Sequence, residues 1–250
     1  MLKRLILGLT FALLAASQAQ AAITVATLGS HAQTTAATNV LTTVTNDCPI
    51  HSTIILLAAN ATAADTLTGV TDSAGNTWQS PVDATAGTGV GLATAYAINT
   101  TVDLPVGGTI TASFTSNTTF INAICVQNLA NTTPLDTHNP PPSTGSAATS
   151  ATSVATGTLR SSAELIVGSL GGNVAMGTFT CPAGFTKPSI NNSGGPSLLM
   201  CYEVVASSSS VGFAPTWTNS ANYVNNVVSF SDTNSGAVAT PKGTLLGVLP

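Results

Sequence analysis

The chain has 250 residues, of which 5 are Lys or Arg and 9 are Asp or Glu, so only 6% of it is charged. An ordinary globular protein is about 25% charged. The hydrophobic share of 44% is ordinary, and it is too high for a classically disordered chain. So few basic residues also exclude a nucleic-acid-binding protein, because binding to phosphates needs Lys and Arg.

The N-terminus has the three parts of a secretory signal peptide. Lys3 and Arg4 form a positive region, residues 5–16 are apolar, and Ala19-Gln20-Ala21 is a small-x-small cleavage site. The apolar run is shorter than the roughly 20 residues that span a membrane. We therefore expect cleavage near Ala21, a secreted or cell-surface location, and no membrane insertion.

After the signal peptide, the sequence follows the periodicity of strands and not that of helices. The clearest case is 108–115, where Ile110, Ala112 and Phe114 alternate with Thr and Ser. Threonine itself favours strands, because its β-branched side chain suits the pleated surface. In chain order, the expected strands are 23–28, 38–44, 53–59, 67–71, 91–98, 108–115, 120–129, 153–159, 164–170, 197–206, 211–216 and 223–230.

Many short strands separated by turn signals, without helices between them, predict an all-β protein. The count favours a single large antiparallel β-sandwich of the jelly-roll or Ig-like kind, with about a dozen strands. In this interpretation residues 1–21 are the signal peptide and residues 22–232 form the sandwich. Residues 131–151 are a long Pro/Ser/Thr loop within it, and residues 233–250 are a tail or an edge strand. No convincing internal repeat is apparent.

Four cysteines in an exported chain indicate disulfide bonds, although four cysteines allow three pairings. Cys181 and Cys201 are the first predicted pair, because they flank a loop rich in Gly, Asn, Pro and Ser. Cys48 with Cys125 follows by elimination. A metal site is the less favoured alternative, since the chain has no C-x-x-C motif.

The residues that usually carry catalysis form no pattern in this sequence. There is no G-x-S-x-G motif, and His31, His51 and His138 have no regular spacing to a nucleophile or to one another. Glycoside hydrolysis needs a pair of carboxylates. Glu164 and Glu203 are the only glutamates, and each lies within an apolar strand, where solvation of the strand is the simpler interpretation. We therefore expect no catalytic residue and no enzyme.

One acidic loop is a candidate calcium site. Asp72 and Asn76 supply side-chain oxygens at the two ends of a five-residue turn, and Asp65 lies just upstream. Calcium in secreted β-sandwiches is bound by oxygen ligands of this type. The alternative is a local turn, because Asp and Asn bond nearby backbone amides. Calcium is therefore the one cofactor that the sequence leaves open.

Two tryptophans are candidates for binding an extracellular glycan. Aromatic rings provide apolar platforms for sugars, with neighbouring polar groups to bond their hydroxyls. Trp78 follows the acidic turn directly and has polar neighbours, whereas Trp217 follows Phe213 and Pro215. With few aromatic residues in the chain, packing in the core is the alternative for both.

Several segments occur in an order that resembles a group of secreted bacterial β-sandwich surface modules. The segments are VTDSAGNTW (70–78), an aromatic-Ala strand at 92–98, NLANTTPLD (128–136) and AELIVG (163–168). They match a V-x-D-x-x-G-N-x-[WY] hairpin, the strand that follows it, a P-L-D loop and an E-L-[IV]-V-G strand. The resemblance implies an exported sandwich in which Gly75 and Asn76 form the hairpin turn and Asp136 stabilises a loop. It implies no catalytic role.

Taken together, these features predict a secreted, non-catalytic structural or interaction protein, such as a surface, matrix, filament or adhesion subunit. The expected partner is a second copy of the chain or an extracellular glycan. Copies could join through a terminal segment (22–33 or 240–250) added to a neighbour's open sheet edge. The favoured alternative for both segments is that they are edge strands of their own domain or mobile tails. The alternative is a carbohydrate-binding module for extracellular polysaccharide, acting through Trp78 or Trp217. A glycosidase-type enzyme is the third and least favoured.

Overall fold

The computed structural model describes residues 22–33, 38–42, 46–62, 67–79, 82–87, 89–98, 100–115, 119–136, 142–160, 163–188, 191–192 and 196–232. Within these residues the protein is all-β, with antiparallel sheets and no helix, so the predicted all-β sandwich is confirmed. The predicted signal peptide, the segment 233–250, Asp65 and His138 lie outside the described residues.

The described part of the chain contains sixteen strands. The first eight are β1 (Thr24–Gln33), β2 (Thr38–Thr42), β3 (Thr53–Asn60), β4 (Leu67–Asp72), β5 (Val82–Gly87), β6 (Val90–Ala97), β7 (Thr109–Phe114) and β8 (Thr119–Gln127). The other eight are β9 (Ser143–Ser150), β10 (Val154–Ala155), β11 (Glu164–Gly172), β12 (Phe179–Thr180), β13 (Asn191–Asn192), β14 (Ser197–Val205), β15 (Gly212–Phe213) and β16 (Thr216–Ser231).

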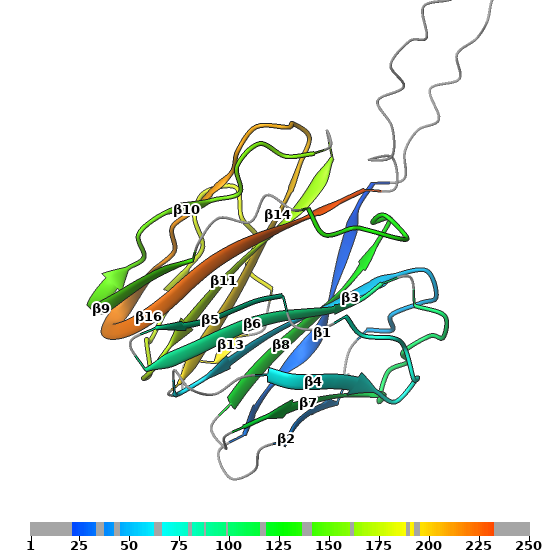
Figure 1. The fold of residues 1–250 in the computed structure, drawn as a ribbon, viewed down its shortest axis with the longest axis horizontal. Coiled ribbons are helices and arrows are strands. Elements are labelled where there is room, and N and C mark those ends of the chain that lie inside the picture. The colour runs from blue at the N-terminus through cyan, green and yellow to red at the C-terminus, as the bar shows by residue number, and fades with distance from the viewer. Residues whose placement is uncertain are drawn as a thin grey trace, which may run out of the picture.

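The strands form stacked layers around two large sheets (Figure 1). The first large sheet has the order β1-β8-β3-β6-β5, and the second is built on β16-β11-β14-β13, with β9 and β12 also paired to β16. A small sheet, β2-β7-β4, packs on the outer face of the first large sheet. The ribbon β10-β15 and its neighbouring loops cover the outer face of the second.

This layering explains why some strands alternate and others do not. β7 lies in an outer layer, where Ile110, Ala112 and Phe114 are buried and the residues between them are partly exposed. The alternation predicted for this strand is therefore confirmed. β3 and β6 lie in the middle of the first large sheet, are covered on both faces and are buried along their whole length. Alternate side chains of the long apolar run in β3 pack into two different cores, one on each face of the sheet.

The two halves of the chain repeat one topology, which corrects the expectation of no internal repeat. Adding eight to each label of the first large sheet, β1-β8-β3-β6-β5, gives β9-β16-β11-β14-β13, which are the neighbours found in the second. The small-sheet pair β2-β7 likewise corresponds to β10-β15. After β4 and β12, each half also makes a turn with an Ala-Gly pair whose glycine (Gly75 or Gly184) has a positive φ. Glycine adopts this φ without the steric cost of a Cβ.

The strand registers repeat as well. In the first half Ile55 of β3 lies opposite Tyr96 of β6, and in the second Val167 of β11 lies opposite Tyr202 of β14. Counting along the ladders from these pairs, all but one of the 25 positions of β3, β6 and β8 fall on a ladder position of β11, β14 or β16. Each half therefore repeats the same arrangement of large-sheet strands, whereas β12 pairs with β16 and its counterpart β4 pairs with β7.

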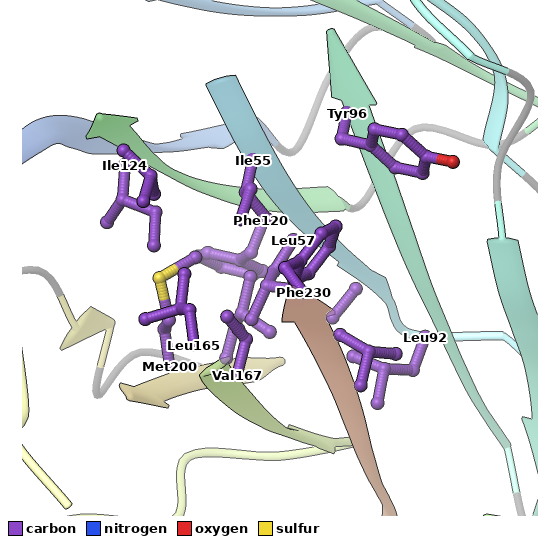
Figure 2. Packing of buried hydrophobic residues seen from close by; sticks show 14 of the residues in the cluster. Ile55, Leu57, Leu92, Tyr96, Phe120, Ile124, Leu165, Val167, Met200 and Phe230 are labelled. Atoms are coloured by element: carbon purple, nitrogen blue, oxygen red, sulfur yellow. The ribbon is translucent and has the colours of Figure 1, made fainter. Parts of the chain in front are cut away.

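The two copies pack with the two-fold-like exchange expected of a symmetric dimer. β11 contacts β6 and its equivalent β3 contacts β14. In the same way, β14 contacts β8 and β6 contacts β16. The shared core between the large sheets contains Phe120, Leu165, Met200 and Phe230, and Figure 2 shows these side chains meeting from both sheets. Tyr96 packs edge-on against Phe230 at 5.5 Å between ring centroids. Burial raises the pKa of the Tyr96 phenol, which keeps the ring neutral in this core.

Both predicted disulfides are present. Cys48 is bonded to Cys125 of β8, and Cys181 is bonded to Cys201 of β14. Each bond joins a loop of the outer layer to a central strand of its own half, although the two bonds occupy different positions of the repeated unit. They therefore hold the outer layers onto the large sheets.

The segment 131–151, expected to be a loop, contributes strand structure instead. Leu135 forms a β-bridge with Phe230, and Ser143–Ser150 forms β9 along the same strand, β16. Together they occupy the edge position that β1 occupies in the first half. Residues 137–141 of this segment lie outside the described residues.

Candidate functional site

Three loops of the first half meet at one end of its sandwich. They are 46–52, which precedes β3, 73–79, which follows β4, and 98–108, which connects β6 to β7, with Asn99 outside the described residues. We call this group the three-loop end. It contains Trp78, Asn76 of the predicted calcium loop and one cysteine of a disulfide, so the structure brings together residues that are far apart in the sequence.

The loops 46–52 and 98–108 are tied to each other by backbone and side-chain bonds. The amide and carbonyl of Cys48 pair with those of Leu104, each N–O distance being 2.9 Å. Asp103 Oδ1 accepts the amide of Ile50 at 2.6 Å, and Asp47 Oδ1 accepts the amide of Val106 at 2.6 Å. The disulfide from Cys48 fixes the pair to β8. These loops therefore have a defined conformation at the surface.

Asp72 organises the loop 73–79. Its Oδ1 accepts the amides of Ala74 (2.9 Å) and Asn76 (3.2 Å), and its Oδ2 accepts the indole N–H of Trp78 at 2.8 Å. The buried Asn76 in turn accepts the amides of Thr101 and Val102 through Oδ1, which joins this loop to the loop 98–108. Asp72 and Asn76 thus have a structural role in the turn, which is the local alternative considered from the sequence.

The predicted calcium site is not assembled among the described residues. No group of three or more His, Cys, Asp or Glu side chains in the described part of the chain is arranged to hold a metal ion. Asp65, the third predicted ligand, lies outside it.

The two tryptophans differ in their surroundings. Trp78 is half-buried: it packs on the core of the first half and keeps part of its surface exposed. Trp217 is only 5% exposed, packs edge-on against Tyr223 at 5.3 Å and donates its indole N–H to Ala148 O at 2.8 Å. Trp217 is therefore a core residue with no free face for a sugar ring, and only Trp78 remains as a candidate.

The surface of the three-loop end is apolar and acidic. Ile50, Val102 and Val106 are 49%, 48% and 54% exposed, and they are half of the exposed large hydrophobic residues in the described part of the chain. Asp47 and Asp103 lie among them and are exposed. The sequence has no Lys or Arg between residues 22 and 159. The sequence did not reveal this patch, because single Ile and Val residues in loops have no distinctive spacing.

The other titratable residues considered from the sequence lie within strands: His31 in β1, Glu164 in β11 and Glu203 in β14. His31 Nδ1 lies 2.7 Å from Asn39 Oδ1, a contact that joins β1 to β2. Glu164 and Glu203 lie diagonally on adjacent strands, because Glu164 pairs with Val205 and Glu203 with Ile166. Glu164 is fully buried, so its carboxyl group has no access to a glycosidic bond in solution.

A second polar cluster joins the segment 131–136 to the second half. The buried Asp136 accepts the amide of Arg160 through Oδ2 at 2.9 Å. The Arg160 guanidinium donates to the carbonyls of Thr133 and Leu135 and to Ser231 Oγ. Asp136 and Arg160 therefore hold the segment 131–136 against the second half.

Within the described residues, no helix is long and apolar enough to cross a membrane. The two disulfides are typical of proteins in an oxidising compartment. Comparison with protein-family models, with curated proteins and with solved structures found no match to this chain.

Proposed function

We propose that this chain is an exported structural or interaction protein that assembles with copies of itself at the cell surface or in the extracellular matrix. The N-terminal signal features and the two disulfides support export. The low charge of the chain supports close packing of copies, because little electrostatic repulsion opposes it.

The observation that carries this proposal is the chemistry of two edge strands. Among the described strands, β2 forms a ladder with β7 alone and β9 with β16 alone, although the Asn39 side chain of β2 also bonds to His31 of β1. Neither strand contains a charged residue or a proline, and Val40 of β2 is 39% exposed. Monomeric β proteins protect such edges with lysine, proline or bulges, because an open edge pairs with other chains. β9 has an irregular register near Ala148, whereas β2 pairs regularly along its whole length.

The first test is the size and shape of the mature protein, measured by light scattering and negative-stain electron microscopy over a range of concentrations. We expect filaments, sheets or large regular particles. Val40→Lys places a charge on the β2 edge and should shift the distribution towards monomer. Ser208→Lys, in an exposed loop of the second half, is the matched control and should leave assembly unchanged. A compact monomer at every concentration would contradict the proposal.

A second candidate function, binding of an extracellular glycan, is favoured by one observation. Trp78 is half-buried, and its indole N–H is fixed by Asp72. Because Trp217 is buried, any shift of tryptophan emission on adding a polysaccharide reports on Trp78. We expect a soluble ligand to shift the emission of the wild type and not that of Trp78→Phe. No shift across a broad polysaccharide panel, with a folded sample, would count against glycan binding.

A further inference from the structure

The repeated architecture provides an internal comparison for the three-loop end. The second half has the same loops in the same places: 156–160 before β11, 181–187 after β12, and 206–211 between β14 and β15. They are tied to one another in a similar way, with the amide of Leu159 bonded to Ser208 O at 3.0 Å and that of Thr156 to Val211 O. The two ends therefore share the order of their loops and the bonding between the first and last of them, although the connection 206–211 is shorter than 98–108.

The surface chemistry of the two ends differs. Where the first half exposes Ile50, Val102 and Val106, the connection in the second half exposes a run of four serines, 207–210. The fold is thus compatible with a fully polar surface at this position. Exposed aliphatic side chains are unfavourable in water unless another surface covers them. The apolar surface of the first half is therefore not a requirement of the fold, and covering by a partner explains it.

The chemistry of the patch defines what would cover it. Three aliphatic side chains favour aliphatic side chains on the partner, and Asp47 and Asp103 favour a cation beside them. Because the disulfide and the bonds between loops already order this surface, little conformational entropy is lost when a partner binds.

One segment of the chain has this combination of residues. Residues 240–250, TPKGTLLGVLP, place Lys242 a few residues before Leu245, Leu246, Val248 and Leu249. Lys242 is one of only three cations after residue 21. Of the other two, Arg160 donates to the carbonyls of Thr133 and Leu135, and Lys187 donates to Phe179 O.

The segment also has the reach to contact another molecule. The described chain stops at Asp232, which forms a β-bridge with Leu129, two residues beyond the end of β8. The eighteen residues 233–250 span up to about 60 Å when extended. Contact of this segment with the patch of the next copy is a head-to-tail interaction, which leaves a free patch and a free segment at the ends of each assembly and so allows growth.

We propose that residues 240–250 of a second copy dock on the three-loop end, with Leu and Val side chains covering Ile50, Val102 and Val106 and with Lys242 beside Asp47 and Asp103. This inference rests on the proposed function, because it assigns a second contact between copies of the chain, in addition to the open strand edges. We expect assembly to need both contacts, so that loss of either one shifts the chain towards monomer.

The test uses the mature full-length chain and three variants, each first checked for a wild-type circular dichroism spectrum and melting temperature. Val102→Ser/Val106→Ser gives the patch the chemistry of its serine counterpart, Lys242→Glu reverses the charge of the segment, and Val174→Ser, at an exposed valine of the second half, is the control. Sedimentation velocity over a range of concentrations measures assembly. A labelled peptide of residues 240–250 measures binding to each chain by fluorescence polarisation.

We expect the patch and segment variants to be monomeric at concentrations at which the wild type and Val174→Ser assemble. We also expect peptide affinity to fall about tenfold or more for the patch variant, since two aliphatic contacts are lost. If all variants assemble as the wild type does, this inference is wrong while the proposed function stands. If the wild type neither assembles nor binds the peptide, both are wrong. If the wild type is monomeric and binds the peptide only after 240–250 is deleted, the segment covers its own patch and a second copy is not the occupant.

Discussion

Replacing both Cys48 and Cys125 by alanine is expected to lower the free energy of unfolding by about 4.5 kcal/mol. The two cysteines are 77 residues apart, and in the chain-entropy description a crosslink of that span removes this much conformational freedom from the unfolded state. Both cysteines are almost fully buried, and the bond holds loop 46–52 on the central strand β8. Alanine avoids leaving an unsatisfied hydroxyl group in the core.

Denaturant unfolding followed by far-ultraviolet circular dichroism gives the comparison, with the m-value checked for each variant. The control is the double variant Cys181→Ala/Cys201→Ala. Its bond spans only 20 residues, so the expected loss is smaller, about 3.3 kcal/mol. A larger loss for the control than for the Cys48–Cys125 pair would show that local packing, and not the span of the crosslink, decides the stability of each half.

Local sequence patterns predicted the strands that have one face on the core and the other in water. Residues 108–115 alternate because β7 has one face on the core and one face in water, and the sequence shows this directly. The disulfide between Cys181 and Cys201 was predictable because both cysteines flank a single loop. The short pairing strands β12 and β13 have only two residues each and carry no periodicity, so no pattern could indicate them.

The repeat was hidden in the sequence because equivalent positions of the two copies carry different side chains. Of the 24 positions of β3, β6 and β8 with ladder counterparts, four are identical: Ile54 with Ile166, Leu92 with Leu198, Tyr96 with Tyr202 and Asn122 with Asn226. Backbone pairing fixes the topology, whereas side chains only need to fill each core, and cores tolerate many apolar combinations. The burial of Trp217 could not be predicted from its neighbours in the sequence either, because it depends on packing against Tyr223 and on a hydrogen bond to Ala148 of the distant strand β9.

Of the three-loop end, only the turn at Asp72–Asn76 could be predicted from the sequence. The Asp72–Asn76 spacing indicates a local Asx turn, which the structure contains. The neighbouring loops lie about 20 residues away in the sequence on either side, and their exposed Ile50 and Val106 are ordinary residues in the sequence. Only the three-dimensional arrangement, together with the serine-rich counterpart in the second half, makes this surface distinctive.

Replacing Gly168 by alanine is expected to destabilise the protein by about 1–3 kcal/mol through overpacking. An added Cβ at this position would lie 2.4 Å from two ring atoms of Phe213, far inside van der Waals contact. Phe213 is fully buried and packs against Phe185 at 5.2 Å between ring centroids, so the ring has no free space into which it can move. The glycine of the E-L-I-V-G segment is therefore required by the close approach of an aromatic ring to the strand.

The matched control is Gly69→Ala in β4, where an added Cβ meets no atom within 4 Å and the backbone needs no positive φ. We expect it to change stability by less than about 0.5 kcal/mol, as exposed substitutions usually do. A double-mutant cycle with Phe213→Leu separates two causes of the Gly168 effect. If the ring is the obstacle, the leucine background should remove most of the cost of Gly168→Ala, giving a coupling energy of about 1 kcal/mol or more. An unchanged cost in that background would show that the strand itself, and not the packing of Phe213, requires glycine.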